Sequence, residues 1–124
     1  IIPIIMKIAV MGEIHEDGWK VFEDNNLESF ELLNFEENNL KKELSEVDAI
    51  LLRTARLNND VLSFCKKLKI VSRHGVGYDN VNLQYLNQNN IALGITSTSN
   101  AVSVAEHVLT SFLYLSKNIY LSDK

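Results

Sequence analysis

Short runs of nearly continuous Ile, Val and Leu alternate along the chain with segments whose apolar residues recur at helical spacing. The runs predict strands at Ile4–Val10, Glu28–Leu33, Ala49–Arg53, Lys69–Arg73 and Ile91–Ile95. Helical spacing predicts helices at His15–Asn25, Glu37–Glu46, Asn59–Lys67 and Asn82–Gln88. Strands that are apolar on both faces are typical of parallel sheets covered by helices. The alternation therefore predicts an α/β fold, a flavodoxin-like, doubly wound parallel sheet of five strands.

Polar residues at three helix starts indicate caps. Asp60 or Asn59 is the expected cap of the third helix, and Asn82 that of the fourth, because their side chains accept from free N–H groups of the first turn. Ser99 or Asn100 is expected to cap a further, longer helix that runs to Lys117.

This last helix differs from the others because it is apolar nearly all round. One face of the helix carries apolar residues at helical spacing. The apolar surface extends around the helix through four further residues, Val102, Val104, Leu109 and Leu113. A helix with no clean polar face is expected to be buried on more than one side. We therefore expect residues 1–99 to form one domain and residues 100–124 to form a crossover helix toward a further domain. The chain is expected to be incomplete, and residues 100–117 to contact a second subunit.

Composition narrows the class of protein. At 124 residues the chain can bury one ordinary core, and its net charge of −4 with a pI near 5.3 argues against nucleic acid or anionic membrane as partner. Its apolar beginning is too short to span a membrane. Cys65 is the only cysteine, so no intrachain disulfide is possible and a cytoplasmic location is expected. We interpret Cys65 as a small core residue.

The candidate chemistry lies where two apolar strands end in arginine. Arg53 follows one strand, and Arg73 runs into the turn Gly75-Val76-Gly77. Glycine lets a backbone approach a ligand closely, so that its N–H groups can point at an anion. Arginine offers a planar fork of donors that suits carboxylate or phosphate. Because ligands of such sheets bind at the carboxyl ends of the strands, these residues predict a small-anion site.

Two segments carry a resemblance to a known family. Arg73-His-Gly-Val-Gly-Tyr-Asp-Asn80, followed by Asn100-Ala-Val-Ser-Val-Ala-Glu-His107, resembles the amino-terminal portion of the D-isomer-specific 2-hydroxyacid dehydrogenases. Ile50-Leu-Leu-Arg-Thr54 resembles the D-3-phosphoglycerate dehydrogenase branch, which catalyses the first step of serine biosynthesis. Thr96-Ser-Thr-Ser-Asn100 departs from the Thr-Pro-Gly-type turn that is common in the family.

The resemblance implies a function for the residues of the predicted anion site. The N–H groups of Val76 and Gly77 would bind the carboxylate of the substrate, and Gly75 would shape the turn. Arg53 and Arg73 would bind the phosphate of the same substrate. Val76, Asn100 and Val104 would contact NAD. The family's dinucleotide fingerprint and its catalytic arginine, acidic residue and histidine are absent from this sequence. The resemblance thus implies the substrate-binding portion of an NAD-dependent oxidoreductase, inactive by itself, that acts on the CH–OH group of a D-2-hydroxyacid such as 3-phosphoglycerate.

Simpler interpretations exist for each of these residues. The two glycines can serve as plain turn residues, Arg53 as a solvated strand end and Arg56 as a surface charge. We assign a structural role to His74 and expect His107 to be buried or to lie between domains. The three histidines show no metal-ligand spacing, so no metal site is predicted. Glu37 and Lys41 are spaced as an exposed helical ion pair.

A standalone flavodoxin-like regulatory or ligand-binding module is the alternative function. Receiver-type modules of this length place clustered acidic residues at the strand ends. Here only Glu13 follows the first strand, while Arg53 and Gly75 follow later ones. This composition favours the anion-binding interpretation.

Overall fold

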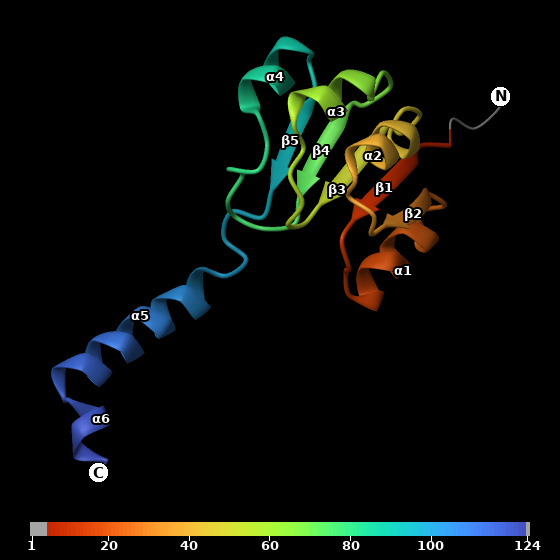
Figure 1. Ribbon diagram of the computed structural model, residues 1–124. Coiled ribbons are helices and arrows are strands. Elements are labelled where there is room, and N and C mark those ends of the chain that lie inside the picture. The colour runs from red at the N-terminus through yellow and green to blue at the C-terminus, as the bar shows by residue number, and fades with distance from the viewer. Residues whose placement is uncertain (1–4, 124) are drawn as a thin grey trace.

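The computed structural model describes residues 5–123 and shows a parallel sheet flanked by helices (Figure 1). The sheet has five strands in the order β2-β1-β3-β4-β5. The strands are β1 (Lys7–Met11), β2 (Glu28–Leu32), β3 (Ala49–Leu52), β4 (Ile70–Arg73) and β5 (Ala92–Ile95). The helices are α1 (Glu16–Asp24), α2 (Glu37–Glu43), α3 (Asn59–Phe64), α4 (Leu83–Gln88), α5 (Ala101–Ser116) and α6 (Ile119–Ser122). The predicted α/β, flavodoxin-like fold is confirmed.

The hydrophobic core lies between the sheet and the layer made by α2, α3 and α4. Alternate strand residues project into it, because successive side chains of a strand point to opposite faces. Met11, Ile50, Leu52 and Val71 are fully buried there, together with Leu44 at the end of α2. Each strand pairs in parallel with its neighbour, so all strands end at one edge of the sheet.

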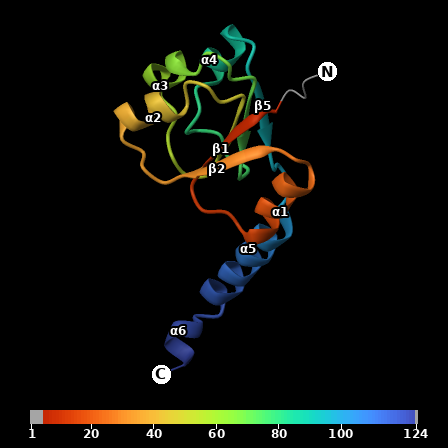
Figure 2. The ribbon, with the colours of Figure 1, turned by 90° about the vertical axis from the view of Figure 1, so that its right-hand side faces the viewer.

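The second face of the sheet carries less cover. Figure 2 shows α1 on this side, opposite α2, α3 and α4. Ile8 and Val10 are buried on β1, but Leu51 on β3 and Ser72 on β4 are only partly buried. The face is therefore well covered near β1 and more open toward β4 and β5.

Element boundaries agree with the predictions to within three residues, and the cap of α3 is corrected. The cap of α3 is Asn58, whose side chain accepts from Val61 N at 2.8 Å, and not Asn59 or Asp60. The same helix ends at Phe64, three residues earlier than predicted, because Cys65 leaves helical geometry at ψ 69°. Asn82 caps α4 as expected, by accepting from Tyr85 N. The strand predicted to begin at Ile4 starts at Lys7, and Ile4 lies outside the described residues.

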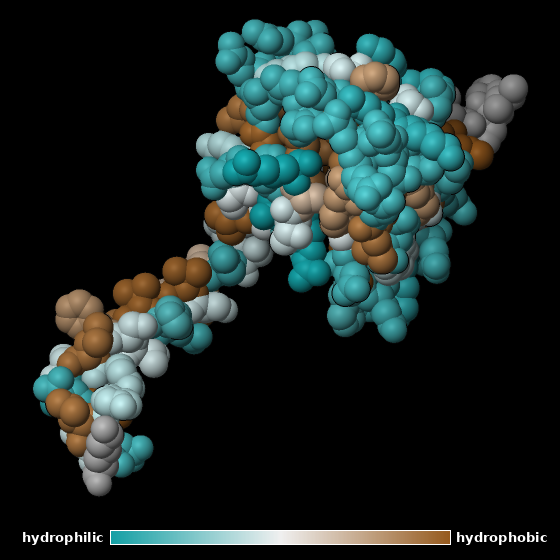
Figure 3. All heavy atoms as spheres, viewed as in Figure 1, coloured by the Kyte–Doolittle hydropathy of each residue, from teal (hydrophilic) through white to brown (hydrophobic). Residues whose placement is uncertain are grey.

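Helix α5 projects away from the sheet and carries an exposed apolar surface (Figure 3). Val102, Leu109, Phe112 and Leu115 are each 65–73% exposed. None of the helix's residues is buried within the described chain, as expected for a helix whose cover comes from a further domain or a second subunit, and that cover stays a prediction. His107, expected to be buried or to lie between domains, is exposed. No helix among residues 5–123 is long and apolar enough to cross a membrane.

Candidate active site

The candidate site lies at the edge where the strands end. There the segments after β3 and β4 run side by side, since Leu52 pairs with Arg73 and His74 N donates to Leu52 O at 2.8 Å. Leu57 and Val81 form a further isolated bridge between the two segments. This parallel pairing places residues 53–57 and 74–81 at one rim of the sheet, as expected for ligand sites in such folds.

The glycine turn is shaped around the side chain of Arg73. Gly75 has φ +153°, in a region that residues with a side chain rarely adopt. A Cβ atom at Gly75 would lie only 2.7 Å from Arg73 Nη1. The turn also contacts the segment after β5, where Thr96 N donates to Gly75 O at 3.2 Å. The backbone conformation therefore favours glycine at this position, whereas the close contact is with the end of a flexible side chain that can shift.

Two hydrogen bonds orient the guanidinium group of Arg73. Its Nε donates to Asn80 Oδ1 at 3.3 Å, and its Nη1 donates to the carbonyl of His74. Asn80 in turn donates through Nδ2 to Ala55 O at 2.7 Å. Arginine has five N–H groups, so the two used here leave others available for a ligand.

The tip of the loop offers backbone donors. Within residues 5–123, the N–H groups of Val76 and Gly77 donate to no protein group, and both residues are exposed. A Cβ at Gly77 would meet only Asp79 Oδ2, at 3.6 Å. Successive backbone N–H groups in such turns make concave sites for anions. These backbone donors and the guanidinium of Arg73 would attract a carboxylate, whereas the carboxylate of Asp79, which lines the same recess, would oppose it.

Recesses open on both sides of this rim. One, of about 240 Å³, is lined by Thr54, Arg73, Gly77, Asp79 and Asn80. A second, of about 300 Å³, lies on the α1 side of the sheet, and its lining includes Ile14, Leu51, His74 and Thr96. A third, of about 430 Å³, lies between the segments that lead into α3 and α4. The first recess holds the residues that combine positive charge with free backbone donors.

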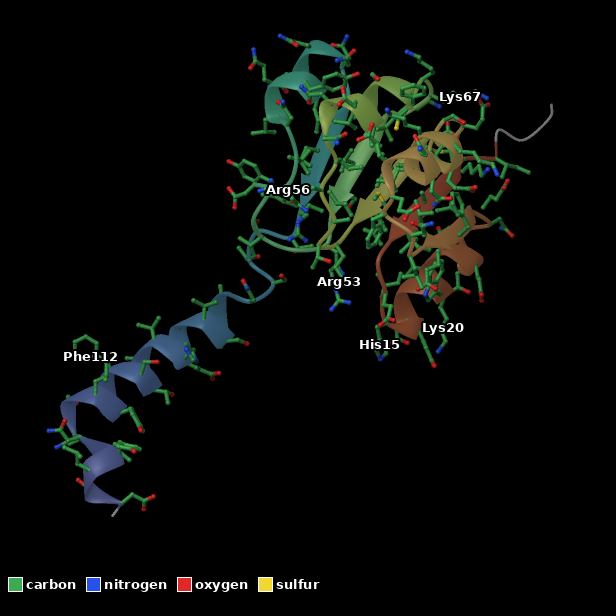
Figure 4. The ribbon with its side chains drawn as sticks, in the orientation of Figure 1. His15, Lys20, Arg53, Arg56, Lys67 and Phe112 are labelled. Atoms are coloured by element: carbon green, nitrogen blue, oxygen red, sulfur yellow. The ribbon has the colours of Figure 1, made fainter. Side chains whose placement is uncertain are left out.

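Arg53 lies apart from this recess. Leu52 and Arg73 are register partners and project from the same face of the sheet, so Arg53, one residue after Leu52, projects from the opposite face. Its Nη1 donates to Glu13 O at 2.8 Å, and the side chain reaches into solvent at the strand end (Figure 4). The structure therefore brings Arg73, Gly75, Val76 and Gly77 together, but it does not place Arg53 in the same recess. Arg56 is exposed, as expected.

The residues expected to contact NAD are accessible. Val76 is 37% exposed and Val104 is 52% exposed, and Asn100, at the start of α5, is exposed without a side-chain capping bond. Apolar side chains of this kind fit the flat face of a nicotinamide ring. However, the turn lacks the third glycine of the dinucleotide fingerprint, so the described residues do not fit a complete dinucleotide site.

Sequence reasoning missed three members of the recess, Thr54, Asp79 and Asn80. In the sequence analysis these residues are only letters within the segments that resemble the family. The sequence does not reveal that Asn80 forms hydrogen bonds with Arg73 and with the segment after β3. A signal was present, since an asparagine between a glycine turn and a helix is a common source of local hydrogen bonds.

Away from this rim, the titratable groups of the described residues offer neither a metal site nor a reactive thiol. Among residues 5–123, no group of three or more His, Cys, Asp or Glu side chains is arranged to hold a metal ion. Cys65 is buried in the core, as expected, and desolvation raises the pKa of its thiol to about 11. Such a thiol is a poor nucleophile near neutral pH.

Comparison with known proteins identifies the family. Residues 8–120 match the model of the D-isomer specific 2-hydroxyacid dehydrogenase, catalytic domain. The chain belongs to this family. D-3-phosphoglycerate dehydrogenase of Archaeoglobus fulgidus is 28% identical over 96% of this chain and 23% of its own length. The same enzyme of Sus scrofa is 31% identical over 93% of this chain and 22% of its own length. The chain thus spans about a fifth of the length of these curated relatives.

Solved structures agree with this assignment. The NAD-dependent formate dehydrogenase of Staphylococcus aureus, in complex with NAD, is 28% identical with a TM-score of 0.77, over 95% of this chain and 40% of that one. The NAD⁺-bound 3-phosphoglycerate dehydrogenase of Entamoeba histolytica is 23% identical with a TM-score of 0.76, over 89% of this chain and 39% of that one. The second likeness shows the shared fold.

Proposed function

We propose that this chain is the substrate-binding part of an NAD-dependent dehydrogenase that acts on the CH–OH group of a D-2-hydroxyacid. The observation that carries the proposal is the pair of unused N–H groups at Val76 and Gly77 beside the guanidinium of Arg73, among the residues that the structure describes. A carboxylate that accepts from these donors would present its C2 carbon toward solvent. There a nucleotide-binding domain outside this chain would bring the nicotinamide and the catalytic residues.

Within this proposal the two arginines have different tasks. Arg73 lies in the recess of Gly77 and would add charge to the carboxylate contact. Arg53 leaves the rim on the other face of the sheet and has only Nη1 committed, to Glu13 O, among the described residues. It would reach the distal phosphate of a substrate such as 3-phosphoglycerate, the substrate named by the relatives that resemble this chain.

Cofactor, assembly and location are part of the same proposal. NAD would be held mainly by the other domain, with Val76, Asn100 and Val104 at its edge. The exposed apolar surface of α5 supports contact with a further domain or a second subunit. The single buried thiol supports a cytoplasmic protein. Family membership favours this function over a standalone regulatory module.

A titration of the chain followed by amide NMR tests the carboxylate site. 3-Phosphoglycerate should shift the backbone N–H signals of Val76 and Gly77, whereas glycerol, which has no anionic group, should leave them in place at the same ionic strength. Glyoxylate, which shares the carboxylate and lacks the phosphate, should shift the same two signals. If both acids moved only distant amides, the proposed site would be wrong.

A further inference from the structure

Asn80 occupies a position that joins the two segments of the candidate site. Its side chain is partly buried, in contrast to the exposed Val76 and Gly77. Through Oδ1 it accepts from Arg73 Nε at 3.3 Å, and through Nδ2 it donates to Ala55 O at 2.7 Å. One amide thus contacts both the residue that carries the charge and the segment that follows β3.

The backbone of Asn80 strengthens the same connection. Its carbonyl accepts from Leu57 N at 3.3 Å, next to the bridge between Leu57 and Val81. The amide side chain and the carbonyl therefore hold residues 55–57 against residues 80–81 from two directions. The guanidinium of Arg73 donates both to Asn80 Oδ1 and to the carbonyl of His74. These two bonds restrict its rotation, so its remaining N–H groups have a fixed orientation in the recess that Gly77 also lines.

We propose that Asn80 is a positioning residue for anion binding, which fixes the guanidinium plane of Arg73 and the separation of the two rim segments. This inference rests on the proposed function for its ligand, but the hydrogen bonds stand without it. A positioned guanidinium binds a carboxylate better than a free one, because less side-chain freedom is lost on binding. Asn80 itself touches no substrate in this proposal and acts through Arg73.

Two substitutions separate the two hydrogen bonds of the amide. Asn80→Asp keeps an acceptor for Arg73 Nε but cannot donate to Ala55 O. Asn80→Leu has similar size and removes both bonds. Asn82→Ala is the matched control, since it removes a capping asparagine two residues away, which donates to Asn59 Oδ1 and accepts from Tyr85 N and does not contact Arg73 through these bonds. The control is expected to lower the melting temperature without changing anion affinity.

The first readout needs no ligand. In the 124-residue chain, the Arg73 Nε–H signal should be resolved and protected from exchange with solvent in the wild type and in Asn80→Asp. It should be averaged and unprotected in Asn80→Leu, at a temperature where circular dichroism shows all variants folded. A protected signal in Asn80→Leu would overturn the proposal. Arg73→Lys, which lacks Nε–H, assigns the signal by its disappearance.

A second variant keeps this readout decisive. If Asn80→Leu did not fold, Asn80→Ala takes its place, because it also removes both bonds and introduces no larger apolar side chain at the rim. Loss of protection in Asn80→Ala would support the proposal, and a protected signal there would overturn it.

The second readout is the dissociation constant for 3-phosphoglycerate. Loss of an oriented charged donor should weaken binding by roughly tenfold or more in Asn80→Leu. Asn80→Asp should also weaken it, because its carboxylate holds Arg73 but adds a negative charge beside the bound anion. Unchanged affinity in both variants, with clear binding by the wild type, would overturn the inference alone. No binding by the wild type would instead overturn the proposed function, and the Arg73 signal would then still decide whether Asn80 holds the guanidinium.

Discussion

Arg53 and Arg73 leave the same rim of the sheet on opposite faces. Arg73 is in register with Leu52, the last residue of β3, and Arg53 follows Leu52 directly. Because side chains alternate along a strand, the two arginines cannot act as a symmetrical pair over one recess. The charge of Arg73 therefore lies beside the glycine turn, whereas the charge of Arg53 extends into solvent. Mutation of one arginine can thus test its contribution to binding without removing the other.

Replacing Arg53 should affect substrates according to their length. In the dehydrogenase proposed above, Arg53→Ala should lower kcat/KM for 3-phosphoglycerate by the equivalent of about 1.5–3 kcal/mol, the typical contribution of a hydrogen bond to a charged group. It should change kcat/KM for a short acid such as glyoxylate little, since that acid has no distal phosphate. Steady-state rates with both substrates decide this. Equal losses on the two would show that Arg53 does not bind the phosphate.

Substitution of Gly77 should harm both substrates without unfolding the chain. The space around Gly77 is open, because an added Cβ would meet only Asp79 Oδ2, at 3.6 Å, so Gly77→Val can fold. The added side chain would block the approach of a carboxylate to the backbone N–H groups. The expected result is a similar loss of kcat/KM on both acids with a nearly unchanged melting temperature. A large loss of stability would instead assign Gly77 to the fold.

Gly75 should be required for stability. Gly75→Ala forces a side chain into φ +153° and brings its Cβ to 2.7 Å from Arg73 Nη1, so the loop or the guanidinium must move. We expect a decrease in the free energy of unfolding of about 1–3 kcal/mol, the usual cost of a strained backbone. Urea unfolding measures the decrease. A variant as stable as the wild type would show that the turn can rearrange freely.

The buried thiol predicts a loss of stability at alkaline pH. Desolvation raises the pKa of Cys65 in the fold to about 11 from its ordinary value of 9.0, so the fold favours the neutral form. Below pH 9.0 both states hold the proton and there is no effect. As the pH rises from 9.0 toward 11, the unfolded state loses its proton first and the free energy of unfolding falls.

Cys65→Ala is the reference for this effect, because tyrosines and lysines titrate in the same range in both proteins. The difference in free energy of unfolding between wild type and variant should shrink by up to about 3 kcal/mol over that range, at about 1.36 kcal/mol per pKa unit. Urea unfolding at several pH values measures it. A pH-independent difference would show that the thiol ionises in the folded chain as readily as in water.

Helix α5 should drive association. Leu109 is 65% exposed and Phe112 is 73% exposed, and contiguous apolar surface of this kind is rare on monomers. The chain is expected to form dimers or larger species in sedimentation experiments. Leu109→Glu combined with Phe112→Glu should return it to a monomer with an unchanged melting profile of the sheet. A wild-type chain that stayed monomeric at high concentration would contradict this expectation.

The chain is also expected to lack turnover by itself. The dinucleotide fingerprint is absent from its sequence, and so are the family's catalytic arginine, acidic residue and histidine. The purified 124-residue chain should show no oxidation of NADH with glyoxylate above the buffer rate. Addition of a polypeptide that carries a nucleotide-binding domain of the family is the positive control. Measurable turnover by the chain alone would contradict the proposed division of the enzyme.

The sequence alone determined the α/β architecture, the place of the glycine turn and the buried role of Cys65. Hydrophobic periodicity reports which face of each element is buried, and this depends on near neighbours in the chain. Tertiary structure decided the rest. Asn80 reaches Ala55 across 25 positions of sequence, and Arg53 faces away from Arg73 because of the strand register. Pairing partners and the direction of side chains at the rim depend on contacts between distant segments, which periodicity along one segment does not encode.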